Sequence, residues 1–343
     1  MSLKKKHVNI PVFIPHLGCP NNCVFCNQRS ISGKKSFEAE SVIPEIEEVL
    51  ATLKDGTEAE IAFFGGSFTG IDRELMISLL DIAQKYIDGG KVSGIRLSTR
   101  PDYISKEIID ILRRYGVKTV ELGIQSMDDK VLEASKRGHT SAQTREACKL
   151  VKEAGFDLIG QMMVGLPGAN VESEKNTARA ICDMGAHGAR VYPTVVFYET
   201  ELCEMSKAGA YSPLSENDAV MRTKEVLKVF DAFGVPCIRV GLCASENLSS
   251  PEAVFGGANH SAIGEMAIGE IFYEKMDELI SALTPEERSK KYMIFYVPKG
   301  CTSKAVGQKR KNILRLCDKY SIYKIKILEK NSIIGYNILL ETV

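Results

Sequence analysis

Three cysteines stand within eight residues of one another near the start of the sequence, in the stretch HLGCPNNCVFCNQRS. Cys19, Cys23 and Cys26 follow the spacing Cys-x3-Cys-x2-Cys, and the other seven cysteines are scattered singly. A closed zinc site needs four ligands, usually in two pairs. The chain has no second CxxC or HxxxH pair, although His16 could supply a fourth ligand. Three thiolates on a four-iron cluster leave one iron open to a small molecule. The spacing therefore favours a catalytic iron–sulfur cluster over a structural metal site.

The composition argues against several other classes of protein. The 343 residues carry 44 Lys and Arg against 44 Asp and Glu, so the net charge gives no attraction to nucleic acid or to membranes. The stretch Met1–His7 is short and basic and leads into no long apolar run, which argues against a signal peptide and a membrane span. We expect a cytoplasmic protein, because clustered cysteines bind metal in a reducing compartment. We expect a small-molecule substrate, and neither nucleic acid nor a membrane as partner.

The segment CPNNCVFC resembles the cysteine motif of the radical S-adenosylmethionine (SAM) enzymes, including the aromatic Phe25 before the last cysteine. The resemblance implies that Cys19, Cys23 and Cys26 ligate a [4Fe–4S] cluster and that SAM chelates the fourth iron. It also implies an electron donor such as flavodoxin or ferredoxin. In this family the reduced cluster cleaves SAM, and the resulting 5′-deoxyadenosyl radical abstracts a hydrogen from the substrate.

Apolar runs of strand length alternate with amphipathic helical runs through the first 200 residues. The run VNIPVFI (8–14) predicts a strand that leads into the cysteine loop, and SVIPEIEEVLATL (41–53) has its apolar residues at helical spacing. Repeated strand–helix units predict a parallel sheet, and about six of them fit before residue 200, too few for a closed eight-stranded barrel. We therefore expect an α/β fold, a partial (β/α)6 barrel of the TIM type with a small C-terminal α+β extension.

This pattern divides the chain into three expected regions. Residues 1–230 form the partial barrel with the cluster and the SAM site, 231–290 complete the barrel and contribute to the substrate site, and 291–343 form a β–α–β accessory unit. The chemistry of such barrels lies at the carboxyl ends of the strands, where the cysteine loop is expected. The Lys/Arg run at 304–315 predicts a solvated helix face, with a lid or a phosphate contact as the alternative.

The second expected strand ends in FFGGSFTG, and two glycines at a strand end let the backbone approach a ligand closely. By the resemblance, Gly65, Gly66 and Ser67 occupy the position whose backbone and side chain bind the amino group of SAM, with Ser67 where Glu is common. Two later segments, RLSTRPDYI (96–104) and ELGIQSMDDKVLEASKRGH (121–139), resemble the branch that contains oxygen-independent coproporphyrinogen oxidase and the catalytic subunit of Elongator. The resemblance extends the SAM-binding set to residues on later strand ends: Ser98, Arg100, Gln125, Ser126, Arg137 and Gln161.

Residues 190–215 strengthen this resemblance through the pattern R-x-Y-P-T-x-V, so we expect an Elongator-like core over roughly residues 8–290. Within these 343 residues we expect no acetyltransferase domain of the kind the Elongator subunit carries, and the additional zinc-binding cysteines and the basic excess of that subunit are not seen. It also lacks the fourth cysteine of the coproporphyrinogen enzyme, since Asn27 and Gln28 follow Cys26. Its architecture resembles that of queuine lyases, which cleave the C–N bond of the free deazaguanine base queuine and yield 7-aminomethyl-7-deazaguanine. The alternatives are a tRNA-modifying Elongator-like enzyme, a coproporphyrinogen-oxidase-like enzyme and a non-enzymatic metal-binding protein.

A planar base needs an aromatic ring to stack on and polar groups at its edge. Candidates of both kinds lie within the Elongator-like motif, within the segment GVPCIRVGLCASENL and shortly after that segment. His260 is the candidate acid, base or hydrogen-bond donor, and the alternative is a structural role at a helix start. Cys243 is a further catalytic candidate, although small buried thiols are common. The expected substrate-binding residues are Tyr192, Phe197, Tyr198, Arg239, Asn259 and Glu265.

Overall fold

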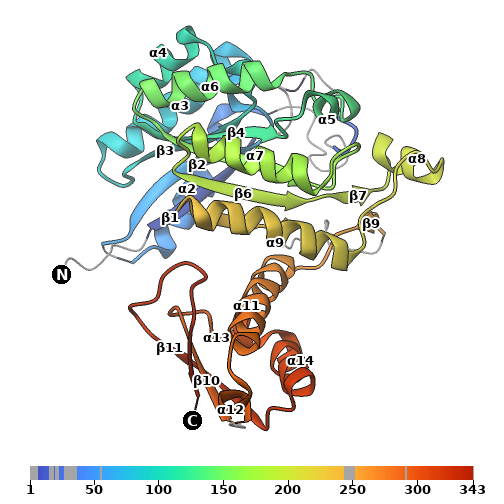
Figure 1. Ribbon diagram of the computed structural model, residues 1–343. Helices are drawn as coiled ribbons and strands as arrows, with labels where there is room; N and C mark the ends of the chain where they lie inside the picture. The colour runs from blue at the N-terminus through green and yellow to red at the C-terminus, as the bar shows by residue number, and fades with distance from the viewer. Residues whose placement is uncertain are drawn as a thin grey trace.

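The computed structural model describes residues 7–14, 19, 23–26, 37–54, 56–242, 252–289 and 292–342. They form a seven-stranded sheet, a three-stranded sheet and a two-stranded ribbon, with the helices packed around them (Figure 1). The strands are β1 (His7–Ile14), β2 (Glu58–Gly65), β3 (Gly94–Thr99), β4 (Val117–Gln125), β5 (Asp157–Val164), β6 (Gly188–Pro193), β7 (Val195–Phe197), β8 (Cys237–Val240), β9 (Val254–Gly257), β10 (Tyr292–Val297), β11 (Lys324–Glu329) and β12 (Leu339–Thr342). The α-helices are α2 (Val42–Thr52), α3 (Arg73–Asp88), α4 (Lys106–Arg114), α5 (Asp129–Ala134), α6 (Ser141–Glu153), α7 (Val171–Asp183), α8 (Glu201–Lys207), α9 (Glu216–Ala232), α11 (Ile263–Ser281), α12 (Pro285–Ser289), α13 (Thr302–Val306) and α14 (Lys311–Tyr320).

The large sheet has the strand order β1-β2-β3-β4-β5-β6-β8, and every neighbouring pair is parallel. Parallel neighbours need a crossover, and helices α2 to α9 lie between successive strands in the sequence. The curled sheet is the partial barrel that the strand–helix alternation predicts. It has seven strands among the described residues, since β8 joins it next to β6.

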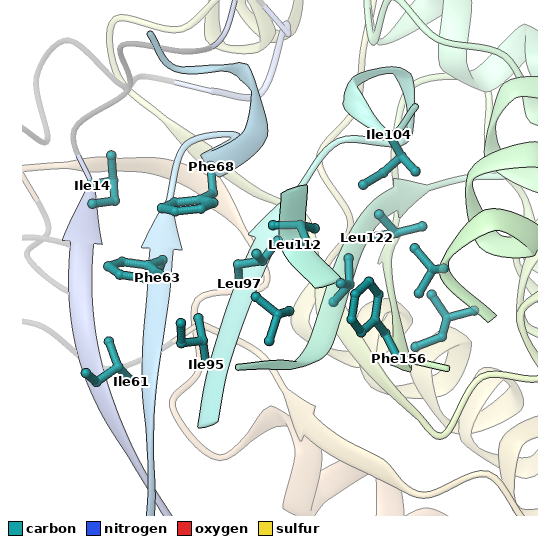
Figure 2. Close-up of a cluster of buried hydrophobic side chains, with 14 of the residues drawn as sticks. Ile14, Ile61, Phe63, Phe68, Ile95, Leu97, Ile104, Leu112, Leu122 and Phe156 are labelled. Carbon is teal, nitrogen blue, oxygen red and sulfur yellow. The ribbon is translucent and has the colours of Figure 1, made fainter. Parts of the chain in front are cut away.

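One face of this sheet forms the main hydrophobic core. Successive side chains in a strand point to opposite faces, and the apolar set of each strand packs against the helices. Figure 2 shows this packing around Phe63 and its stacked neighbour Phe68, whose ring centroids are 4.6 Å apart. The residues that alternate with the core point to the concave face, and several of them are charged. This unequal use of the two faces leaves the concave face free for chemistry.

Side-chain caps set where the covering helices begin. Asp72 accepts backbone hydrogen bonds at the start of α3, Ser105 at the start of α4, and Thr140 and Asn170 form capping boxes at the starts of α6 and α7. Each cap satisfies amide groups that have no partner within the helix. The helices therefore begin immediately after the loops that carry the candidate site residues.

The C-terminal unit has its own small sheet, with the order β11-β10-β12. Strands β10 and β11 are parallel and are joined through α13 and α14, as the β–α–β prediction requires. The additional strand β12 pairs antiparallel with β10, which the sequence pattern did not predict. A second core, formed by α11, α14 and the inner face of this sheet, includes Phe272, Met293 and Phe295. In Figure 1 the unit continues from α11 and lies apart from the helices α3, α4 and α6. Within the described part of the chain, no helix is both long and apolar enough to cross a membrane.

Candidate active site

The cysteine loop follows β1 at the carboxyl edge of the large sheet, next to the end of β2. Cys19 Sγ lies 3.5 Å from Ser67 Oγ, so the loop contacts the residue that follows the glycine pair. Gly65 has a φ of +113°, and a β-carbon there would lie 2.3 Å from the carbonyl oxygen of Ile14. Only glycine fits this close approach. The glycine pair thus brings the end of β2 against the start of the cysteine loop.

Two buried guanidinium groups converge on Cys23. Nη1 of Arg137 lies 3.4 Å from Cys23 Sγ, and Nη1 of Arg100 lies 4.0 Å from it. Arg100 is 2% exposed and also binds Asp102 through two 2.9 Å hydrogen bonds. Burial alone would lower the pKa of Arg100, but the Asp102 carboxylate holds it above its ordinary value. Two fixed positive charges therefore lie beside the sulfur of Cys23.

The end of β4 supplies the next part of the site. Arg137 Nη2 donates to the carbonyl oxygen of Gly123, and a β-carbon at Gly123 would lie 2.9 Å from that nitrogen. Gln125 has a φ of 65° and is 5% exposed, a strained conformation of the kind that concentrates at functional sites. Ser126 is buried beside it, and its hydroxyl accepts from the backbone amide of Asp128. The sheet register shifts between Gly123 and Gln125, which redirects the Gln125 side chain.

The residues at this edge fit both groups that the sequence implies. Among the described residues no three His, Cys, Asp or Glu converge on a single ion. The buried atoms Gln125 Oε1 and Arg137 Nε have no hydrogen-bond partner within the described part of the chain. A buried polar atom without a partner is costly. The amino group of SAM is a donor that complements Gln125 Oε1, and its carboxylate is an acceptor that complements Arg137 Nε.

His139 lies next to this site, and the sequence analysis did not single it out. Its side chain is fully buried, and Nε2 lies 3.3 Å from the carbonyl oxygen of Ile124. Burial, followed by the positive charge of Arg137, lowers the pKa of His139 to about 4. The ring is therefore neutral at physiological pH and supports the backbone that leads into Gln125.

A buried charged cluster, which we call the concave cluster, lies further along the concave face and consists of Arg96, Glu121 and Arg190. Glu121 Oε2 lies 3.0 Å from Arg190 Nε and 3.7 Å from Arg96 Nη2. Burial raises the pKa of Glu121, and the two arginines oppose that shift. In the part of the chain that the structure describes, Nε and Nη2 of Arg96 have no hydrogen-bond acceptor, although the residue is only 7% exposed. The sequence analysis did not single out these three residues; a charged residue at an alternate position of an apolar strand was the signal that could have found them.

Two expected substrate residues lie beside the concave cluster. Tyr192 accepts a 3.3 Å hydrogen bond from Arg190 and follows it on β6, and burial raises the pKa of its hydroxyl. Arg239 on β8 is close enough to lower the pKa of Glu121, and its Nε donates to Gly241. Two SAM candidates also face this side: Ser98 lies beside Glu121 in the neighbouring strand, and Gln161 is half-buried on β5.

The other expected substrate residues lie elsewhere. Phe197 and Tyr198 are at the ribbon of β7 and β9, where Tyr198 is 41% exposed and packs edge-on against Phe255. His260 accepts from the backbone amide of Ala262 through Nδ1 at the start of α11, which leaves Nε2 for any substrate contact. Asn259 and Glu265 are exposed on either side of it. Cys243 lies outside the described residues.

A parallel half-barrel with thiols after its first strand and a glycine pair after its second defines a class of enzymes that bind an organic cofactor at the carboxyl edge of the sheet. The radical SAM superfamily model matches residues 13–181, and the radical SAM C-terminal domain model matches residues 186–272. The chain belongs to the radical SAM superfamily. Members of this superfamily use a [4Fe–4S] cluster and SAM.

Curated relatives match this chain over different fractions of its length. An uncharacterized protein of Methanocaldococcus jannaschii, MJ0486, is 32% identical over 63% of this chain and 70% of its own length. The tRNA uridine(34) acetyltransferase of the same organism is 32% identical over 47% of this chain and 34% of its own length. Human Elongator complex protein 3 is 30% identical over 53% of this chain and 32% of its own length. The chain therefore spans about a third of these two larger relatives.

Solved structures show the same fold. Elp3 from Methanocaldococcus infernus superposes with a TM-score of 0.59 and 22% identity over 79% of this chain and 68% of that chain. Methylornithine synthase superposes with a TM-score of 0.50 and 17% identity, over 75% of this chain and 76% of that chain. At these identities the likeness extends to the fold alone. The expected partial barrel and the expected Elongator-like core are thus confirmed.

Proposed function

We propose that this chain uses radical SAM chemistry on a compact, polar, planar substrate bound over the concave cluster, and that the reaction is cleavage of the C–N bond of free queuine. When bound, the reduced cluster and SAM supply a 5′-deoxyadenosyl radical that abstracts a substrate hydrogen. The observation that carries the proposal is a buried carboxylate, Glu121, between Arg96 and Arg190, with hydrogen-bonding groups of Arg96 unused among the described residues.

This arrangement suits the edge of a guanine-type base. Such a base presents adjacent N–H donors and a carbonyl acceptor. Glu121 would accept from the donors, and Arg96 would donate to the carbonyl oxygen. Arg190 opposes the effect of burial on the pKa of Glu121, and its guanidinium lies over the Phe64 ring, 5.2 Å from the ring centre, so the two groups form one surface beside Glu121. Tyr192 and Arg239 would line the same surface.

We propose the following roles at the carboxyl edge of the sheet. Cys19, Cys23 and Cys26 hold the cluster, and the guanidinium groups of Arg100 and Arg137 lie against Cys23. The amino-acid part of SAM lies at the ends of β2 and β4, where Arg137 Nε and Gln125 Oε1 lack partners among the described residues. The proposed SAM-binding set is Gly65, Gly66, Ser67, Ser98, Gln125, Ser126, Arg137 and Gln161. We also propose that the chain is divided into three regions, residues 1–230, 231–290 and 291–343. Residues 231–290 close the substrate side of the barrel.

The cluster assignment has a direct test. The variants Cys19→Ala, Cys23→Ala and Cys26→Ala should each lose bound iron and the visible absorption of the reconstituted protein, because each removes one thiolate ligand. Cys148→Ala and Cys182→Ala are the matched controls, since burial raises the pKa of these thiols to about 12 and about 11. A full iron content in any of the first three variants would refute the ligand set.

The substrate assignment is tested by anaerobic incubation of reconstituted enzyme with SAM, a reductant and queuine, followed by mass spectrometry. We expect 7-aminomethyl-7-deazaguanine together with 5′-deoxyadenosine. Glu121→Gln should still cleave SAM slowly but form much less product, whereas Glu153→Gln, at an exposed position on α6, should match the wild type. SAM cleavage without any deazaguanine product would refute the lyase and leave the radical SAM assignment intact.

A second candidate function is modification of a base within tRNA. Relatives named tRNA uridine(34) acetyltransferase favour it, although this chain spans about a third of their length. Repeating the incubation with unmodified tRNA and analysing its nucleosides separates the two functions.

A further inference from the structure

The neutral net charge of the chain is the average of two oppositely charged parts. Residues 292–343 contain ten Lys and Arg but only three Asp and Glu, whereas residues 1–291 contain 34 basic and 41 acidic residues. The C-terminal unit therefore carries a surplus of seven positive charges, and the rest of the chain an equal negative surplus. An overall charge of zero thus hides a strongly basic unit.

Part of this positive charge has a structural role. Lys311 and Arg315 on α14 pair with Glu270 on α11 at 3.3 and 2.9 Å, and Lys319 pairs with Asp277 at 2.7 Å. These pairs fasten α14 to α11. Lys311 and Arg315 belong to the basic run at 304–315, so only part of the helix face that was expected to be solvated is paired with another helix.

The remaining cations gather near the small sheet. Six of them are exposed and form no salt bridge with any residue that the structure describes: Lys299, Lys309, Arg310, Lys324, Lys326 and Lys330. Arg310 immediately precedes α14, Lys324 and Lys326 lie on the edge strand β11, and Lys330 follows that strand. An exposed edge strand is a site where other chains can bind, and lysines on it oppose pairing with another sheet.

One face of the small sheet has no helix on it among the described residues. Met293, Phe295 and Val297 point into the core beneath α11 and α14. The alternate residues Tyr292, Ile294 and Tyr296 point to the opposite face and are half-buried. The register places Tyr292 beside Lys324 and Ile294 beside Lys326, so rings and cations lie next to one another.

Two contacts confirm that this open face combines rings with cations. Lys324 Nζ lies 5.4 Å from the ring centre of Tyr292, and Lys330 Nζ lies 5.6 Å from that of Tyr296. A cavity of about 360 Å³ opens at the edge of β11. Tyr292, Arg310 and both lysines of the strand line it on one side, and residues of the helix-covered core line the other: Val306, Ile313, Ile325 and Ile327. The cations and the ring therefore line one side of the same recess.

We propose that this open face, formed by Tyr292, Tyr296, Arg310, Lys324 and Lys326, binds a single-stranded segment of RNA. Lysines and arginine neutralise phosphates, and tyrosines on a sheet face stack against unpaired bases. RNA presents unpaired bases in its loops, where a flat aromatic surface reaches them. An acidic protein would use the cations but not the half-buried rings, and a membrane surface would not need the recess.

The test uses the full reconstituted enzyme and a fluorescent oligoribonucleotide of about 12 nucleotides, within the range of site sizes for single-strand binders. Fluorescence anisotropy at several salt concentrations gives the affinity and its salt dependence. We expect measurable binding that weakens as salt rises. The double variant Lys324→Ala/Lys326→Ala should reduce the slope of log K against log salt by about 1.4, since each lost phosphate contact contributes about 0.7.

The ring variants separate stacking from simple charge attraction. Tyr292→Leu should weaken binding about tenfold with an unchanged salt slope, and Tyr292→Phe should bind like the wild type because it keeps the ring. Lys130→Ala/Lys149→Ala, at exposed positions on α5 and α6, is the control with the same change of charge. SAM cleavage at the wild-type rate verifies that each variant is folded.

Three outcomes would overturn the proposal. The first is equal affinity of Tyr292→Leu and the wild type, which would show that no base stacks there. The second is an equal loss in the Lys130/Lys149 control, which would show only general charge attraction. The third is binding of polyglutamate, anionic vesicles or a DNA oligonucleotide as tightly as the RNA. Because RNA binding is measured without turnover, its failure is distinguishable from failure of the lyase assignment.

Discussion

At the scale of single residues, the site depends on arginines whose charges are buried and directed. Arg137 uses Nη1 towards Cys23 and Nη2 towards Gly123, while its Nε has no partner among the described residues. A guanidinium can make these three interactions at once because its donors are fixed in a plane. A lysine at this position would keep the charge and lose the geometry.

Replacing Arg137 with Lys should therefore weaken SAM binding while a cluster still assembles. The loss should be roughly 10- to 100-fold, since a hydrogen bond to a charged group contributes about 1.5–3 kcal/mol. Isothermal titration calorimetry with SAM measures the affinity, and the iron content reports the cluster. Arg113→Lys, on an exposed face of α4, is the control. Unchanged SAM affinity would show that Arg137 only positions the cysteine loop and does not bind SAM.

His139 predicts a pH dependence of stability. Its pKa is about 4 in the folded chain, below the value of about 6.5 for an unfolded histidine. The unfolded state then binds more protons between these values. The contribution of His139 is complete above pH 6.5 and is lost as the pH falls towards 4, by up to about 3 kcal/mol.

The variant His139→Gln should flatten this dependence, because glutamine can donate to Ile124 but does not titrate. Thermal unfolding midpoints between pH 4 and 7 measure the effect. His187→Gln is the control, since the side chain of His187 is about half exposed. Parallel midpoint curves for wild type and His139→Gln would contradict the buried neutral ring.

At the scale of elements, two strand ends must approach each other before any cofactor can bind. Strands β1 and β2 pair in register from His7 and Glu58 to Ile14 and Gly65. The last pair carries the close contact between Gly65 and the Ile14 carbonyl group. The cysteine loop begins immediately beyond this pair, so its position depends on a glycine in another strand.

The variant Gly65→Ala should lower stability by about 2 kcal/mol or more and impair cluster assembly, since it combines a disfavoured φ with a backbone clash. Gly90→Ala is the matched control: its φ is +67°, but a β-carbon there meets nothing within 4 Å. Unfolding midpoints and iron content measure both effects. Equal losses in the two variants would mean that the clash with β1 has no importance.

At the scale of the whole molecule, the loop between β11 and β12 connects the C-terminal unit to the barrel. Tyr336 in this loop packs edge-on against Phe272 at 6.0 Å and belongs to the borders of two apolar clusters. One cluster is the core of the C-terminal unit, and the other joins α9 to α11. The ring therefore holds the basic unit against the barrel.

Tyr336→Ala should loosen this connection without affecting the cluster. We expect limited proteolysis between residues 330 and 338 to become roughly tenfold faster, since a local loss of about 1.4 kcal/mol raises the open population tenfold. Tyr323→Ala is the control, because Tyr323 is 85% exposed. Wild-type rates of cleavage in Tyr336→Ala would contradict a holding role for the ring.

The sequence alone predicted the family and most of the elements. The cysteine spacing, the glycine pair and the strand–helix alternation are local patterns, and local patterns follow from residue types and the periods of helix and strand. The expected strand at 8–14 and helix at 41–53 correspond to β1 and α2 within one residue at each end. Arg100 and Arg137 were also selected, through motifs around them.

Only the tertiary structure decided which distant side chains meet. It placed Arg100 and Arg137 on Cys23, and it joined Arg96, Glu121 and Arg190 from three strands that are far apart in the sequence. It showed that Nδ1 of His260 accepts a backbone hydrogen bond at the start of α11, and that β12 belongs to the small sheet. Register and sheet curvature determine these contacts, and neither can be read from a single segment, because each depends on where another strand lies.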